Sequence, residues 1–98
     1  MNTTFLVLDA YVVNTLMADL VGHDRRPSAF LVYLAVFAAA GPQGRAGLSY
    51  LQLAERTGLS KRAAQDAVKL LVRRGLVEVT RRGPTEIPQY RPLAPWRR

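Results

Sequence analysis

The sequence contains no cysteine and a single histidine, His23. Neither a disulfide framework nor a thiolate metal site is therefore available, and one histidine cannot build a zinc site alone. Long apolar runs are also missing, because charged residues interrupt the N-terminal half before any run reaches the roughly 18 to 20 residues that span a bilayer. The first residues lack the basic start of a signal peptide. We expect a cytoplasmic protein with no metal, no other cofactor, no membrane contact and no evident small-molecule ligand.

Acidic residues are few and unevenly placed along the chain. The 98 residues include 14 Lys and Arg against 7 Asp and Glu, for a net charge of +7. Residues 45–98 hold twelve of the basic and four of the acidic groups, whereas residues 1–44 are nearly neutral. Positive charge gathered in one half of a small domain attracts a polyanion such as nucleic acid.

The same scarcity of chemistry-bearing residues argues against an enzyme. No glycine-rich phosphate loop follows a predicted strand, and His23 beside Asp24 is typical of a solvated loop pair rather than a catalytic dyad. We therefore predict a protein that binds rather than catalyses.

Apolar periodicity in the first half predicts two helices. Val13, Leu16, Met17 and Leu20 recur at helical spacing within a helix over about residues 10–21, which Gly22 should end. Residues 29–40 are apolar on every side, so this segment should be a largely buried helix that stops at Gly41 and Pro42. Residues 43–47 form a glycine-rich connection that needs no structure of its own.

The second half carries sharper boundary signals. Ser49 can cap a short helix with Leu51, Leu53 and Ala54 on its apolar side, and Gly58 can end it. Ser60 can cap a helix that runs to about Arg74, followed by a strand over 76–80, a turn over 81–84 and a return strand over 87–91. Pro88 favours an edge position for the return strand. The predicted fold is mainly α with a small β-hairpin.

The segment from Leu48 to Val77 resembles the helix-turn-helix of bacterial winged-helix transcription regulators. The resemblance rests on Leu53 and Ala54 in the first helix, the turn Gly58-Leu59-Ser60, an apolar face in the second helix, and Gly75-Leu76-Val77 before the wing. With the preceding apolar helix it covers about residues 28–91, and it is similar to the winged modules of plasmid replication initiators too. It implies one domain over 1–98, with an N-terminal extension (1–24), a winged-helix core (28–91) and a basic tail (92–98).

Physical reasoning gives these residues separate roles. Gly58 tolerates the positive φ of a tight corner and Leu59 can fill that corner, so the start of helix 60–74 should protrude and enter the major groove of double-stranded DNA. Arginine and glutamine suit base edges, whereas lysine and hydroxyl groups suit phosphates. The candidate DNA-binding residues are Ser49, Tyr50, Ser60, Lys61, Arg62, Gln65, Asp66 and Lys69, with Arg81 and Arg82 at the wing.

Several of these residues can also be explained without any contact to DNA. Arg62 and Asp66, four residues apart, can pair on a solvated face, and Asp66 repels phosphate unless it accepts a cytosine amino group or orients Arg62. Arg81 and Arg82 can belong to a soluble turn. Two alternatives to DNA readout also remain: a winged helix that only docks a protein partner in a larger assembly, and attachment to an anionic membrane.

Leu70 and Val72 should point outward from helix 60–74, where apolar side chains need cover. The cover can come from helix 10–21 or from a second subunit. We expect a homodimer formed through the first 24 residues, whose two-fold symmetry would engage two DNA half-sites. The sequence thus predicts a sequence-specific DNA-binding protein, most simply a small transcription regulator.

Overall fold

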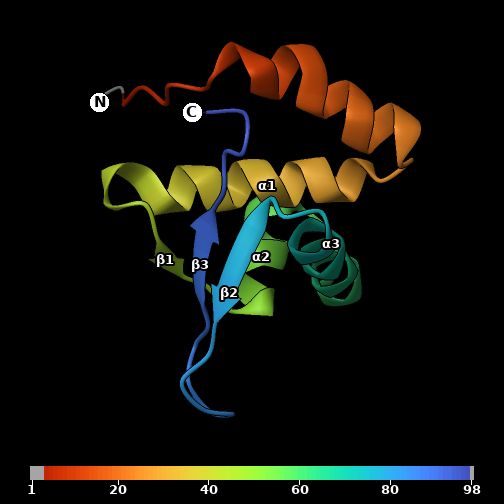
Figure 1. Cartoon of the computed structure of the whole chain (residues 1–98). Coiled ribbons are helices and arrows are strands. Elements are labelled where there is room, and N and C mark those ends of the chain that lie inside the picture. Colours follow the sequence, from red (N-terminus) through yellow and green to blue (C-terminus); the bar gives the residue numbers. More distant parts are fainter. Residues whose placement is uncertain (1–3, 98) are drawn as a thin grey trace.

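Helix α1 (Pro27–Ala40) lies at the centre of the computed structural model, which describes residues 4–97 (Figure 1). The N-terminal helix crosses one side of it, and α2, α3 and strand β3 pack against the other. Val32, Tyr33 and Val36 of α1 are completely buried. The predicted all-round apolar core helix is confirmed, including its stop at Gly41. Residues 1–3 of the predicted extension and Arg98 of the basic tail lie outside the described residues.

The N-terminal helix spans residues 10–23 and is wound mostly as a π-helix, in segments η1 (Val12–Leu16) and η2 (Ala18–His23). Backbone N–H groups here bond five residues back, as Met17 does to the carbonyl of Val12. Gly22 lies inside η2, so the prediction that it ends the helix was wrong. Three apolar residues at a spacing of four face the core: Val12, Leu16 and Leu20.

The chain ends of the described region are clamped together across the top of α1 (Figure 1). Arg97 donates two hydrogen bonds to the Asp9 carboxylate, at 2.6 and 2.7 Å, and the indole N–H of Trp96 donates a third at 2.7 Å. The Trp96 ring stacks on Tyr11 with centroids 4.6 Å apart. The Tyr33 hydroxyl donates to the carbonyl of Leu93 at 3.0 Å. The C-terminal segment therefore fastens the N-terminal helix onto α1.

Helices α2 (Tyr50–Thr57) and α3 (Lys61–Arg73) begin and end close to where the sequence predicts. Ser49 and Gln52 form a capping box, with the Ser49 hydroxyl accepting from the Gln52 N–H at 3.1 Å. The expected apolar side of α2 needs one correction. Leu51 is 57% exposed because it faces away from the core that buries Leu53 and Ala54.

The sheet has three antiparallel strands in the order β1 (Ala46–Gly47), β3 (Gln89–Pro92), β2 (Val77–Thr80). Two expectations were wrong. The connection over 43–47 contributes strand β1 after a short 3₁₀ turn, η3 (Gly41–Gln43), and the return strand is central rather than at the edge.

Proline does not prevent the central position of β3. Pro88 precedes the strand, where no ladder N–H is needed, and its carbonyl accepts from the Leu48 N–H at 3.1 Å.

The two apolar residues expected to need cover on α3 differ in the structure. Leu70 is partly buried and packs against the core of its own chain, so it needs no second subunit. Val72 is 46% exposed.

The clamp predicts a pH dependence of stability. Hydrogen bonds from Arg97 and Trp96 lower the pKa of Asp9 from 3.8 to about 2. A depressed carboxyl pKa stabilises the fold above the unfolded value and loses that contribution as pH falls through the folded value. Asp9→Asn should therefore lower the melting temperature at pH 7, and its difference from the parent should shrink between about pH 4 and pH 2.

Thermal unfolding followed by circular dichroism at several pH values measures this difference. Glu55→Gln is the control, because among residues 4–97 the structure gives Glu55 no ion pair. An Asp9→Asn protein that melts with the parent at pH 7 would show that the clamp contributes nothing.

Candidate nucleic-acid interface

The corner between α2 and α3 has the backbone geometry that the sequence predicts. Gly58 adopts φ +77° and ψ 7°, a left-handed conformation that glycine reaches without a Cβ clash. Leu59 is partly buried against the core, and its N–H donates to the Thr57 hydroxyl at 3.3 Å. Ala64, Ala67, Val68 and Leu71 form the buried side of α3. Its opposite side is left uncovered.

The uncovered side of α3 presents the predicted reading residues. Lys61, Arg62, Asp66 and Lys69 are exposed, and Gln65 is half-buried. The Ser60 hydroxyl accepts from the Ala63 N–H at 3.0 Å, so it serves first as the helix cap.

Arg62 and Asp66 do pair in the structure. Arg62 Nε lies 3.5 Å from the Asp66 carboxylate, with the two side chains 84% and 51% exposed. The solvated pair considered as the ordinary alternative therefore exists. An exposed pair of this kind contributes only about 0.3–0.5 kcal/mol, so a base edge can compete for Arg62 at little cost.

A cleft of about 280 Å³ lies where the wing approaches the starts of α2 and α3. It brings together four of the predicted residues, from three separate parts of the chain: Ser49, Tyr50, Lys61 and Arg81. Sequence reasoning missed its remaining lining residues, Leu51, Thr85, Glu86, Ile87 and Pro88. Leu51 directly follows Tyr50 in α2, whereas the other four lie between β2 and β3 and reach the cleft only through the fold of the hairpin.

Arg81 is held in this cleft by Tyr50. Its guanidinium donates to the Tyr50 hydroxyl at 3.1 Å and lies 5.7 Å from the centre of the ring. A hydrogen bond and a cation–π contact on one guanidinium restrict its position before any ligand arrives. Tyr50 thus connects the first helix of the motif to the wing.

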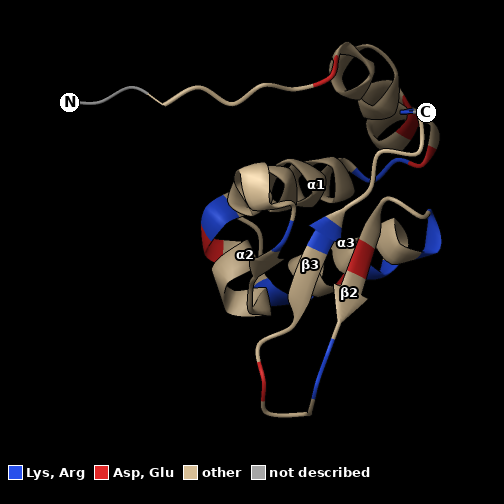
Figure 2. Cartoon of the chain, turned by 60° about the vertical axis from the view of Figure 1, so that its left-hand side comes forward, with Lys and Arg blue, Asp and Glu red and all other residues tan. Residues whose placement is uncertain are grey.

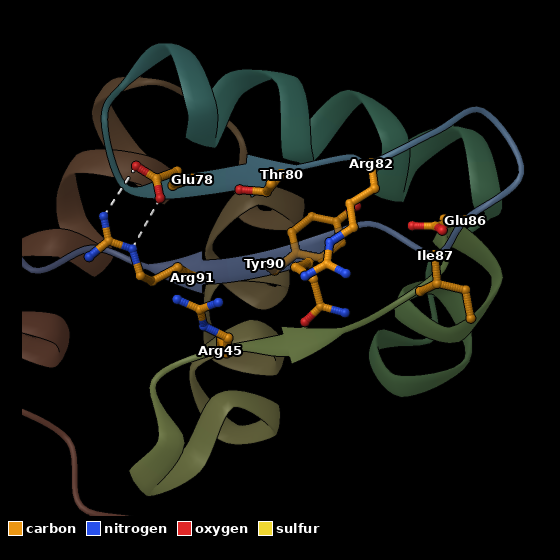
Figure 3. Close-up of a pocket in the computed structure, with 9 residues that line it drawn as sticks. Arg45, Glu78, Thr80, Arg82, Glu86, Ile87, Tyr90 and Arg91 are labelled. Atoms are coloured by element: carbon orange, nitrogen blue, oxygen red, sulfur yellow. Dashed lines mark hydrogen bonds and ion pairs between the residues drawn. The ribbon is translucent and has the colours of Figure 1, made fainter.

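Arg82 lies apart from Arg81, on the opposite face of the hairpin. It lines a second hollow, of about 390 Å³, over the outer surface of the sheet. Figure 3 shows its guanidinium extended over the strands and Arg45 reaching over the same surface from β1. Sequence reasoning treated Arg81 and Arg82 as one contact. It also missed Arg45, a single charge in a segment that was expected to have no structure.

The outer hollow also contains acidic groups. Arg91 donates two hydrogen bonds to Glu78, both 3.1 Å, and these lower the pKa of Glu78. In Figure 2 the limb of the wing that leaves β2 is basic and the returning limb carries an acidic residue. Glu86 borders both hollows, but only the inner cleft adjoins the exposed basic residues of α3, which makes that side the better surface for a polyanion.

His23 and Asp24 have a structural use. His23 Nδ1 lies 3.1 Å from the Asp24 carboxylate, with the His23 side chain 85% exposed, and Asp24 also pairs with Arg74 at the end of α3. These contacts lower the pKa of Asp24 and attach the N-terminal helix to α3. Residues 4–97 contain no group of three or more His, Asp or Glu placed to hold a metal ion.

A family model for the helix-turn-helix domain matches residues 26–77, just over half of the chain and the whole of α1, α2 and α3. The chain belongs to the helix-turn-helix domain family. Family membership, together with the antiparallel hairpin of β2 and β3 after α3 and its third strand β1, identifies the fold as a winged helix with an added N-terminal helix.

DNA binding is the general property that membership in the helix-turn-helix domain family supports. No curated protein and no solved structure gives a significant match to the chain. Within the described residues, no helix combines the length and the apolar character needed to cross a bilayer.

The corner of the helix-turn-helix predicts that Gly58 cannot be replaced freely. A side chain in the left-handed region costs roughly 1–2 kcal/mol, so Gly58→Ala should lower the free energy of unfolding by about that amount. Gly22→Ala is the matched control, because Gly22 lies in a helix with open space around it and no positive φ. Alanine should be neutral there or stabilise by about 0.5–1 kcal/mol. Equal effects of the two substitutions in urea unfolding would contradict the strain assigned to Gly58.

Proposed function

We propose that this protein is a sequence-specific double-stranded DNA-binding protein, a small transcription regulator acting in the bacterial cytoplasm and not an enzyme. One observation carries the proposal: the uncovered N-terminal half of α3 adjoins a cleft that gathers Tyr50, Lys61 and Arg81 from both helices and the wing. A protruding helix fits the major groove, and flanking cations and hydroxyls fit the phosphates beside it.

Base reading is assigned to Arg62 and Gln65. Both lie in the first two turns of α3, the part of a recognition helix that reaches base edges. Asp66 positions Arg62 through their ion pair, which answers the objection that a carboxylate on this face would only repel DNA. Its free oxygen can also accept from a cytosine amino group.

Phosphate contact is assigned to the cleft and its surroundings. Lys61 and the Arg81 guanidinium held by Tyr50 supply charge, and the hydroxyls of Tyr50 and Ser49 supply donors. Ser49 and Ser60 cap their helices through oxygen lone pairs, so their hydroxyl protons remain available to a phosphate. Lys69 extends the basic side of α3, and Arg82 contacts flanking DNA from the outer face of the wing.

A homodimer completes the proposal. One module with about five phosphate contacts binds weakly at physiological salt, and two modules related by a two-fold axis engage two half-sites together. The N-terminal extension, residues 1–24, is the segment we assign to self-association.

Base readers and phosphate contacts should respond differently to substitution. Arg62→Ala or Gln65→Ala should each weaken binding to the preferred duplex by roughly 1–3 kcal/mol and leave binding to random duplex almost unchanged. The preferred site comes from selection in a random duplex pool, and titrations on both duplexes give the comparison. Arg73→Ala, at the far end of α3, is the control. If neither reader variant differs from the parent, α3 is not the reader, and a protein-docking role becomes the better account.

The salt dependence of binding tests the phosphate contacts. About five such contacts imply a slope of log K against log salt near −4.5, and removing one of them should flatten the slope by about 0.9. Arg81→Ala should flatten the slope by about that amount. Arg82→Ala should have a smaller effect, because its guanidinium lies on the opposite face of the hairpin. A slope near zero for the parent would contradict DNA binding, and a larger effect of Arg82→Ala would show that the outer face approaches the duplex.

A further inference from the structure

Exposed apolar side chains are concentrated in the N-terminal extension. Seven of the eleven large hydrophobic residues that the structure leaves exposed lie between positions 5 and 21: Phe5 (85%), Leu6 (50%), Val7 (81%), Tyr11 (38%), Val13 (48%), Met17 (38%) and Val21 (39%). Exposed apolar side chains gathered in one segment favour a protein-interaction site.

These residues form two features. Residues 4–8, here called the arm, are extended and lead away from the body of the protein, as Figure 2 shows. Val13, Met17 and Val21, here called the stripe, recur every four residues along the N-terminal helix, each one position after a residue of the buried row, so the stripe flanks that row. Phe5, Leu6 and Val7 of the arm and all three residues of the stripe are exposed, whereas Leu8 is partly buried against the core of its own chain.

The arm cannot cover the stripe of its own chain. Asp9, at the base of the arm, is fixed by its hydrogen bonds to Arg97 and Trp96, which set the direction in which the arm departs. Reaching the stripe would require a complete reversal at this fixed residue. A second copy of the chain supplies the missing surface without any reversal.

The dimensions and charges of the two features match. The four extended residues 4–7, which precede Leu8, span about 13 Å, and the stripe rises at most about 12 Å along its helix, so the free part of one arm can lie along all three of its side chains. The arm carries no charge, and two of the three acidic residues between positions 9 and 24 are neutralised inside the chain, Asp9 by Arg97 and Asp24 by Arg74. The third, Asp19, has no ion pair within residues 4–97 and belongs to neither feature, so an arm on the stripe brings apolar surface and no charge of its own into the contact.

We propose that two copies of this protein exchange their N-terminal arms, each arm packing on the stripe of the other copy around a two-fold axis. The proposal specifies the surface of the homodimer that the proposed function includes, and it does not depend on DNA binding. Two reciprocal arm contacts form one self-complementary interface.

Analytical ultracentrifugation of the full chain tests the assembly. The parent should sediment as a dimer at micromolar concentration, and Phe5→Asp with Val7→Asp should sediment as a monomer. Ile87→Asp is the control, because Ile87 is an exposed apolar residue, at 55%, that lies on the wing outside both the arm and the stripe, and this variant should stay dimeric. A monomeric parent, or a double variant that remains dimeric, overturns the proposal.

The absence of cysteine allows a direct test of which surfaces meet. Val7→Cys chains mixed with Met17→Cys chains should give a disulfide-linked heterodimer under mild oxidation, because the arm of one lies on the stripe of the other. Disulfides that form only between two Met17→Cys chains would show that the helices pack on each other without arm exchange, and this result would overturn the proposal.

Duplex binding separates this proposal from the proposed function. The monomeric arm variant should keep the affinity of the parent for a single half-site and lose about 100-fold or more on a paired site. If the parent binds no duplex at all, DNA recognition fails while the sedimentation and disulfide results still decide the arm exchange.

Discussion

The burial of α1 is the constraint on which the rest of the fold depends. A helix that is apolar on all sides needs cover over most of its surface, which no single neighbour can supply, and of the large hydrophobic side chains that the structure describes in α1 only Leu31 stays exposed, at 42%. The helix-turn-helix and the sheet cover one side of α1, and the N-terminal helix covers the other. The extension is therefore part of the core: Val12, Leu16 and Leu20 are as deeply buried as the residues of α1 that they contact. The clamp at Asp9 secures this cover from the C-terminal segment.

The candidate interface follows from the same packing. Because α2 and α3 pack against α1 and against each other, the outer side of α3 is left uncovered and the starts of both helices lie near the wing. Tyr50 and Arg81, 31 residues apart, meet there through a hydrogen bond and a ring contact. The cleft is consequently a product of the tertiary fold, even though each residue in it lies at the end of a locally determined element.

Features governed by local chemistry could be predicted from the sequence. Ser49, Ser60, Gly58 and Gly75 act on backbone within a few residues of themselves, and the boundaries they imply for α2 and α3 are confirmed. Family membership confirms the resemblance to winged regulators that these residues suggest.

Features governed by distant pairing could not be predicted. Strand β1 exists because Ala46 meets Tyr90, and β3 is central because it pairs on both sides. No residue close to Gly47 or Pro88 in the sequence indicates which strand each segment pairs with. The exposure of Leu51 has the same origin, since it depends on which face of α2 packs against the core. The separation of Arg81 from Arg82 depends on how the hairpin is oriented, and the amino-acid composition does not predict that orientation.

That separation makes the length of the wing matter. Successive side chains along an extended limb point to opposite faces, so parity alone decides that Arg81 meets Tyr50 while Arg82 lies over the sheet. Deleting or inserting one residue between Val77 and Thr80 would exchange the two guanidiniums, whereas a change of two residues would preserve their sides. A related chain whose wing is longer or shorter by two residues can thus keep an arginine facing the cleft. A chain whose wing differs by one residue needs a basic residue at a neighbouring position to supply the same charge.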